Sequence, residues 1–228
     1  MTATTRQRAS KKSPEGIKAG PDGKDVHYVP SLRHELGMAD FVTMGNAICG
    51  TGSIFLCLNY LENEHYHRYI KWAFVLLPIG LFFDLIDGWV ARKRYSSPFG
   101  GDLDSLADLI SFGVAPSCLG FTLGLRGIWD SVIMIFFVLC GVGRLARYNV
   151  TAEFISGDTG KVKYYEGMPI PGSLLIVIML FIAWYTDATH DDIWGGKLEV
   201  YPGHFHPLSL VYLVMGVLMV SLVRIPKP

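Results

Sequence analysis

Long apolar blocks alternate with short polar stretches along most of the 228-residue chain. Each block holds about twenty residues, the length that an α-helix needs to cross the hydrocarbon core of a bilayer. The pattern therefore predicts an all-α membrane protein with about six transmembrane helices. The six spans are expected near residues 41–61, 69–91, 103–124, 129–148, 170–186 and 207–223.

The first 35 residues differ in composition, since they are rich in Lys, Ser, Pro and Gly and contain no apolar run. Such a segment buries too little apolar surface to offset the entropy lost on folding. We predict a disordered cytoplasmic arm over residues 1–35, which runs into a short helix near 31–40, and no cleavable signal peptide. The transmembrane domain would then cover residues 36–228.

Charged residues stand at the ends of the second and third spans, where an isolated membrane helix would hold none. Residues 84–108 read DLIDGWVARKRYSSPFGGDLDSLAD. Asp84 and Asp87 are three positions apart and Asp104 and Asp108 are four apart, so each pair shares one face of a helix. Polar groups at this depth must face the interior of a helix bundle.

Two such helices that face each other bring four carboxylates together near an apolar core. Carboxylates in this setting repel one another and lose hydration, so they need neutralising partners. Hard divalent cations bound by oxygen ligands meet this need. We predict a site for two divalent ions, Mn²⁺ or Mg²⁺, formed by Asp84, Asp87, Asp104 and Asp108. The alternative is a set of capping or ion-paired aspartates, and a cap is the interpretation adopted for Asp102.

The distribution of Lys and Arg sets the expected orientation in the membrane. With a cytoplasmic N-terminus, the arm, residues 92–102, residues 144–169 and the C-terminus together hold sixteen of the twenty basic residues. An even number of spans places both termini on that side, and the aspartates then open to the cytoplasm. The net charge is zero, so the composition does not indicate a nucleic-acid partner.

The aspartates belong to a longer pattern, Asp84-x2-Asp87-Gly88-x2-Ala91-Arg92-x7-Gly100-x3-Asp104-x3-Asp108. This pattern resembles the signature of the CDP-alcohol phosphatidyltransferases, although the gap before Gly100 is slightly shorter than usual. The resemblance implies a membrane enzyme with the helix bundle of that family, and a homodimer. Such an enzyme breaks the pyrophosphate of a CDP-linked substrate and passes the phosphoryl group to an alcohol.

The resemblance also implies roles for single residues. Asp108, the last aspartate of the pattern, would be the catalytic base for the acceptor hydroxyl. The residues that would line the CDP pocket are Asp84, Gly88, Ala91, Arg92 and Gly100. The partner of Arg92 stays open between an aspartate and the pyrophosphate.

Further segments extend the resemblance to the phosphatidylserine synthases within this family, over roughly residues 41–180. They are TMGNAICG at 43–50, LDSLADLISFGVAP at 103–116, GRLARYN at 143–149 and EGMPIP at 166–171. This resemblance implies CDP-diacylglycerol and L-serine as substrates, with phosphatidylserine and CMP as products.

Candidate acceptor residues lie outside the aspartate pattern. Arg144 and Arg147 end the fourth span, where a cation suits the carboxylate of serine; the alternative is that they anchor the span end among lipid phosphates. Asn149 is a candidate for orienting either substrate. Asn46 either contacts a substrate or forms an interhelical hydrogen bond.

The sequence is compatible with two other functions. One is the same chemistry with a different alcohol, such as inositol or glycerol phosphate. The other is a divalent-cation or proton-coupled transporter, since buried aspartates also mark ion paths, although a transporter has no need for the Gly88, Ala91 and Gly100 spacing. We expect the endoplasmic reticulum as the location in a eukaryote and the plasma membrane in a microbe.

Overall fold

The computed structural model describes residues 17–19, 25–27, 37–63, 66–93, 100–156, 164–189, 193–221 and 224–226. Contacts divide the chain into two units, Met1–Leu36 and Gly37–Pro228. In the first unit, β1 (Ile17–Ala19) pairs antiparallel with β2 (Asp25–His27). The prediction of a disordered arm did not foresee this strand pair. Most of the helix expected near 31–40 lies outside the described residues. The division into a cytoplasmic arm, residues 1–35, and a transmembrane domain, residues 36–228, stays a prediction.

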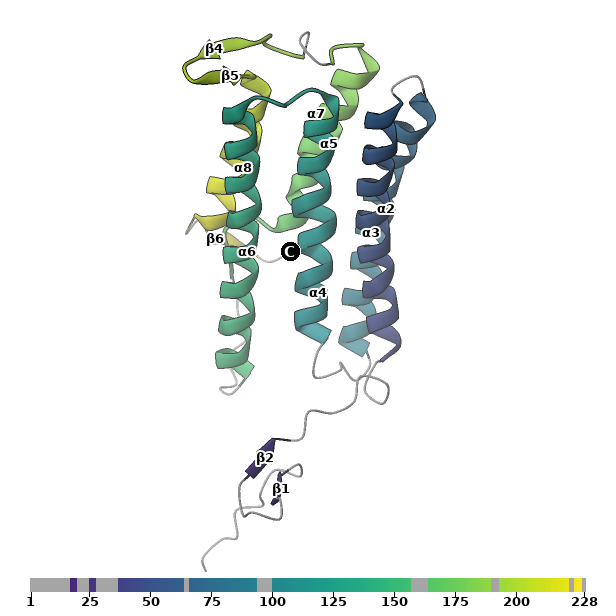
Figure 1. Cartoon of the computed structure of the whole chain (residues 1–228). Coiled ribbons are helices and arrows are strands. Elements are labelled where there is room, and N and C mark those ends of the chain that lie inside the picture. Colours follow the sequence, from purple (N-terminus) through teal and green to yellow (C-terminus); the bar gives the residue numbers. More distant parts are fainter. Residues whose placement is uncertain are drawn as a thin grey trace, which may run out of the picture. The chain divides into compact units, whose positions relative to one another are not determined.

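The second unit is a bundle of apolar helices (Figure 1). Its long helices are α2 (Met38–Glu62), α3 (His67–Lys93), α6 (Ile128–Ser156) and a continuous rod of α4 (Gly100–Asp108), the π-helix η1 (Leu109–Val114) and α5 (Ala115–Leu123). Four stretches are long and apolar enough to cross a membrane, namely Ala39–Glu62, His67–Trp89, Gly100–Leu123 and Ile128–Thr151. They coincide with the first four predicted spans.

The last two predicted spans correspond to shorter apolar helices. These are η2 (Ile170–Ser173) with α7 (Leu174–Tyr185), and η4 (Pro207–Ser209) with α8 (Leu210–Val220). Both stretches have fewer residues than a helix normally needs to cross a bilayer alone. The all-α membrane fold is therefore confirmed, with four full-length helices and two shorter ones in the described part of the chain.

Large apolar side chains cover the outside of the bundle as well as its interior. Trp72 and Phe82 are more than half exposed, whereas Phe112 and Tyr212 are fully buried. The buried Tyr212 hydroxyl donates to the carbonyl oxygen of Pro116 at 2.7 Å. An apolar exterior is the expected surface of a protein whose helices face lipid tails.

Helix α2 lies close to the π-helical turn η1 because Gly50 has no side chain. A Cβ at Gly50 would clash with both the backbone and the hydroxyl of Ser111. The Ser111 hydroxyl donates to the carbonyl oxygen of Asn46 at 2.8 Å. On α3, a Cβ at Gly80 would lie 3.0 Å from Asn46 Oδ1. Three elements therefore meet around Asn46.

Short strand pairs and one buried polar contact fix the segments that connect the helices. The strand pairs are β4 (Leu198–Val200) with β5 (Gly203–Phe205), and, elsewhere, β3 (Tyr164–Glu166) with β6 (Arg224–Pro226). Asp130 accepts hydrogen bonds from the backbone N–H groups of Gly127 and His206 at 3.0 and 2.9 Å. The His206 ring lies 2.6 Å from the same carboxylate, which fixes the segment before η4 against the start of α6.

Candidate active site

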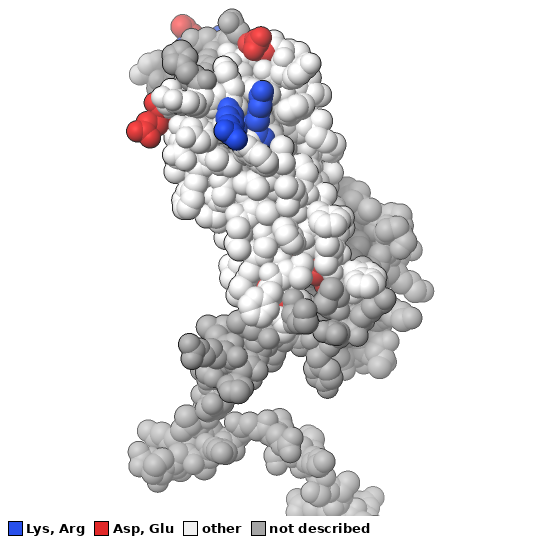
Figure 2. All heavy atoms as spheres, turned by 90° about the vertical axis from the view of Figure 1, so that its right-hand side faces the viewer, with Lys and Arg blue, Asp and Glu red and all other residues white. Residues whose placement is uncertain are grey.

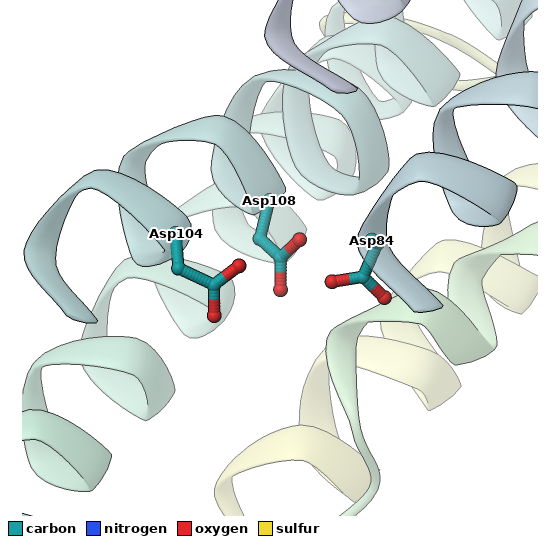
Figure 3. Close-up of side chains that lie close together, drawn as sticks. All are labelled: Asp84, Asp104 and Asp108. Atoms are coloured by element: carbon teal, nitrogen blue, oxygen red, sulfur yellow. The ribbon is translucent and has the colours of Figure 1, made fainter. Parts of the chain in front are cut away.

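Three aspartate side chains converge between α3 and α4 (Figure 3). One carboxylate oxygen from each of Asp84, Asp104 and Asp108 lies within 4.8 Å of the other two. Asp104 and Asp108 are one helical turn apart on α4, so both side chains leave the same face of that helix. Among the described residues, this is the only group of three or more His, Cys, Asp or Glu that is close enough to hold a metal ion.

Burying these three carboxylates costs free energy unless a positive charge lies beside them. Asp108 is buried, and Asp84 and Asp104 are half-buried. Asp104 Oδ1 is shielded from solvent and has no hydrogen-bond partner within the described structure. A buried carboxylate that lacks both a donor and a cation destabilises a fold by several kcal/mol. The unpaired oxygen therefore points to a ligand that supplies positive charge.

Asp87, the fourth aspartate of the predicted metal site, lies one helical turn beyond Asp84 on α3. Its side chain is 5% exposed, and Oδ2 has no hydrogen-bond partner among the described residues. Asp87 is not part of the group whose oxygens lie within 4.8 Å of one another. It thus has the same need for a cation as Asp104, and its place as a fourth ligand stays a prediction.

The converging residues suit hard divalent cations. Asp84, Asp104 and Asp108 offer oxygen atoms alone, which are the ligands that Mg²⁺ and Mn²⁺ prefer. The unpaired buried oxygens on Asp87 and Asp104 add two acceptors that no described protein donor satisfies. The donor set and its missing charge therefore both fit a divalent-metal centre.

Asn46 reaches this group from α2. Its side chain is fully buried, and Nδ2 donates to Asp108 Oδ1 at 3.1 Å. Asn46 Oδ1 is also buried and has no hydrogen-bond partner in the described part of the chain. Of the two alternatives for Asn46, the interhelical hydrogen bond is the one observed; a substrate contact stays a prediction.

Asn149 connects α6 to the beginning of α4. Its Nδ2 donates to Asp102 Oδ1 at 3.1 Å, and its Oδ1 accepts from the Ser105 hydroxyl at 3.0 Å. The predicted cap Asp102 therefore contacts a neighbouring helix. This arrangement places Asn149 beside the helix that carries Asp104 and Asp108.

The two predicted acceptor arginines lie on the same helix as Asn149. Arg144 and Arg147 are both half-buried and three positions apart on α6, so they share one face. Next to them, Gly143 is exposed, and a Cβ there would meet no atom of the described part of the chain within 4 Å. The structure thus leaves open space beside the arginines, and their contact with a substrate stays a prediction.

The residues predicted to line the CDP pocket occupy the ends of α3 and α4. A Cβ at Gly88 would meet no atom of the described residues within 4 Å, so that part of the structure leaves room for a ligand on α3. Gly100 is the first residue of α4 and is half-buried. Ala91 and Arg92 lie in the last turn of α3, and their side chains are outside the described structure.

Comparison with known proteins decides the family. The sequence profile described as CDP-alcohol phosphatidyltransferase matches residues 36–223. The chain belongs to the CDP-alcohol phosphatidyltransferase family. The family resemblance seen in the aspartate pattern is thereby confirmed.

Relatives of this phosphatidyltransferase carry more specific names. A CDP-diacylglycerol–serine O-phosphatidyltransferase of Saccharomyces cerevisiae is 42% identical over 209 residues, which cover 90% of this chain and 75% of the relative. A Bacillus subtilis protein of the same name is 34% identical over 68% of this chain and 77% of its own. An archaetidylserine synthase of Methanothermobacter thermautotrophicus is 29% identical over 84% of this chain and 70% of its own. Enzymes of this family generally depend on divalent metals, in keeping with the acidic group.

Two residues near the phosphatidyltransferase signature were missed by reasoning from the sequence. Ser111 fixes the backbone of Asn46, and Ser105 fixes the side chain of Asn149. Both serines lie on the rod that carries Asp108, at positions a turn or less from a signature aspartate. Their position next to the aspartates was a signal, but a serine in an apolar helix more often bonds to its own backbone.

Proposed function

We propose that this phosphatidyltransferase transfers the phosphatidyl group from CDP-diacylglycerol to L-serine, which gives phosphatidylserine and CMP. The observation that carries the proposal is the convergence of Asp84, Asp104 and Asp108 from the two helices of the family signature. Serine as the acceptor is supported by the names of the relatives, including the yeast enzyme at 42% identity over most of this chain.

The metal site of the proposal consists of Asp84, Asp104 and Asp108, with Asp87 as the fourth ligand. Its occupants are two divalent ions, Mg²⁺ or Mn²⁺. The support is the all-oxygen donor set together with the unpaired buried oxygens of Asp87 and Asp104. When bound, such ions neutralise the phosphate oxygens and the charge that develops on the leaving CMP.

Asp108 has the role of general base in this proposal. Its carboxylate accepts the proton of the serine hydroxyl while the serine oxygen forms a bond to the phosphorus of the phosphatidyl group. The bond from that phosphorus to the bridging oxygen of the pyrophosphate breaks, and CMP leaves with the electron pair. Since Asn46 donates to Oδ1 of Asp108, Oδ2 is the oxygen assigned to the incoming proton.

The two substrates are assigned to different sides of the aspartates. The cytidine diphosphate is assigned to the open end of α3 and the start of α4, where Asp84, Gly88, Ala91, Arg92 and Gly100 lie. The serine is assigned to α6, with its carboxylate on Arg144 or Arg147 and with Asn149 and Asn46 as orienting amides. The half-buried arginines and the open space at Gly143 support this side.

Orientation and assembly belong to the same proposal. The excess of basic residues on one side supports a cytoplasmic N-terminus and an active site that opens to the cytoplasm. The enzyme is assigned to the endoplasmic reticulum in a eukaryote and to the plasma membrane in a microbe, as a homodimer in either case. Residues 1–35 form its cytoplasmic arm, and residues 36–228 form its catalytic domain.

An acceptor comparison tests the proposal. Purified protein with CDP-diacylglycerol and Mn²⁺ is given serine, inositol or glycerol 3-phosphate, and CMP release is measured. Serine alone should stimulate CMP release strongly. Stimulation by inositol or glycerol phosphate instead would assign a different acceptor, whereas no release with any alcohol, together with cation uptake into vesicles, would favour a transporter.

A further inference from the structure

A groove of about 850 Å³ runs between α3 and α7. Its walls are aliphatic and aromatic side chains of both helices, among them Phe74, Ile79, Ile178 and Phe181. Ile79 and Ile178 are also among the exposed apolar residues, so the groove opens to the lipid-facing surface of the bundle. Its volume is within the range of about 300–1,000 Å³ that is usual for small-molecule sites.

One end of the groove carries a positive charge. Lys71 alone is charged among the described residues that line the groove, and its Nζ lies 5.9 Å from the centre of the Trp184 ring. Arg68 precedes Lys71 by three positions on α3 and is also exposed, so the two cations share a face. Figure 2 shows basic side chains gathered toward one end of this apolar surface.

The charged end of the groove lies far from the aspartates. Lys71 is near the beginning of α3, and the thirteen positions from Lys71 to Asp84 correspond to about 20 Å along a helix. Trp184 and Tyr185, at the end of α7, border the groove at the same level as Lys71. Aromatic and basic side chains in this combination are typical of a membrane–water interface. The groove therefore begins at the interface opposite the catalytic end.

We propose that this groove binds an anionic glycerophospholipid from the leaflet opposite the aspartates. The phosphate lies at Lys71, and an acyl chain follows the apolar walls past Val75 and Ile178 toward the bundle centre. Lipid is the occupant because the groove opens to hydrocarbon and has almost no polar lining except at Lys71. An anionic headgroup is favoured because the adjacent cations, Lys71 and Arg68, attract it.

Native mass spectrometry of the full-length protein, released from detergent, tests this site. The protein is titrated with dioleoyl phosphatidylglycerol or with dioleoyl phosphatidylcholine. The expected result is a first lipid-binding event that is tighter for phosphatidylglycerol. Lys71→Ala should weaken that event by about fivefold, the effect of removing one cation near a lipid surface, and should weaken phosphatidylcholine binding less, because choline already offsets the phosphate charge of that headgroup.

Two further variants separate the groove from other lipid contacts. Ile178→Trp fills the groove and should abolish the first binding event for both phosphatidylglycerol and phosphatidylcholine. Lys197→Ala removes an exposed lysine from the loop between α7 and α8, outside the groove lining, and should change neither titration. If Ile178→Trp does not fold, the comparison of Lys71→Ala with Lys197→Ala still decides the question.

Three results would overturn the proposal. One is equal affinity for the two lipids in the unaltered protein. Another is a Lys71→Ala variant that keeps the full preference for phosphatidylglycerol. The third is an Ile178→Trp variant whose KM rises for CDP-dioleoylglycerol but not for a short-chain CDP-diacylglycerol, which would assign the groove to the tail of the substrate. All three are independent of which alcohol the enzyme uses.

Discussion

Asn46 of α2 and Asp108 of α4 are joined by a hydrogen bond of 3.1 Å across 62 positions of sequence. Both side chains are buried, at 0% and 7% exposure, so the bond lies in a setting of low polarity. A fixed amide donor there orients the carboxylate. Because Ser111 holds the Asn46 backbone, the orientation of Asp108 depends on the packing of α2 against η1.

Replacement of Asn46 by alanine should therefore reduce turnover more than substrate binding. A hydrogen bond to a charged group contributes about 1.5–3 kcal/mol, so kcat should fall by about ten- to a hundredfold. The KM for CDP-diacylglycerol should change much less, since the proposed nucleotide residues lie on other helices. Steady-state kinetics of serine-dependent CMP release measure both quantities.

Ser53 offers a matched control on the same helix. It is fully buried, and its hydroxyl donates to the Ala73 carbonyl oxygen at 3.0 Å, away from the aspartates. Ser53→Ala and Asn46→Ala should both lower the thermal midpoint of the purified protein, but Ser53→Ala should leave kcat near its normal value. An equal loss of kcat in both variants would mean that Asn46 is merely structural.

Metal removal should abolish activity reversibly. Chelation takes away the charge that the buried oxygens of Asp87 and Asp104 need, and added Mn²⁺ or Mg²⁺ should restore turnover. Binding of Mn²⁺, measured by electron paramagnetic resonance, should weaken in Asp84→Asn and stay unchanged in Asp187→Asn, which alters an exposed residue near the end of α7. Full turnover in excess chelator would refute the metal site.

The orientation in the membrane can be read from labelling of introduced cysteines. The four native cysteines are free, so they are first replaced by serine or alanine. An impermeant thiol reagent added from the non-cytoplasmic side should label Asn63→Cys and Lys197→Cys but not Gly101→Cys or Thr151→Cys. The reverse labelling pattern, or a glycan on the Asn149-Val150-Thr151 sequon, would place the aspartates on the other side.

The helices and the converging aspartates follow from patterns that are local in sequence. The length of the apolar blocks located all six helices, because twenty apolar residues have few stable arrangements other than a membrane span. The spacing of Asp104 and Asp108 placed both on one face of α4, and their burial cost implied that Asp84 would face them. Local periodicity and charge thus predict most of the site.

Contacts between segments that are distant in sequence could not be predicted from the sequence patterns. The choice of Asp108 as partner for Asn46 depends on how closely α2 can approach η1, which Gly50 permits. The π-helix itself inserts an extra residue into the turn after Asp108, and no residue type in Leu109–Val114 specifies it.

The variant Asp108→Asn tests the central claim most directly. The asparagine keeps the size of the side chain but cannot accept the proton of the serine hydroxyl. Serine-dependent CMP release should fall by about 10²–10⁴-fold, as is typical when a general base is lost, while CDP-diacylglycerol still binds. Asp187→Asn, the same change of side chain at an exposed position near the end of α7, is the matched control and should retain most of the activity. Near-normal turnover in Asp108→Asn would contradict the account, because the base would then lie elsewhere.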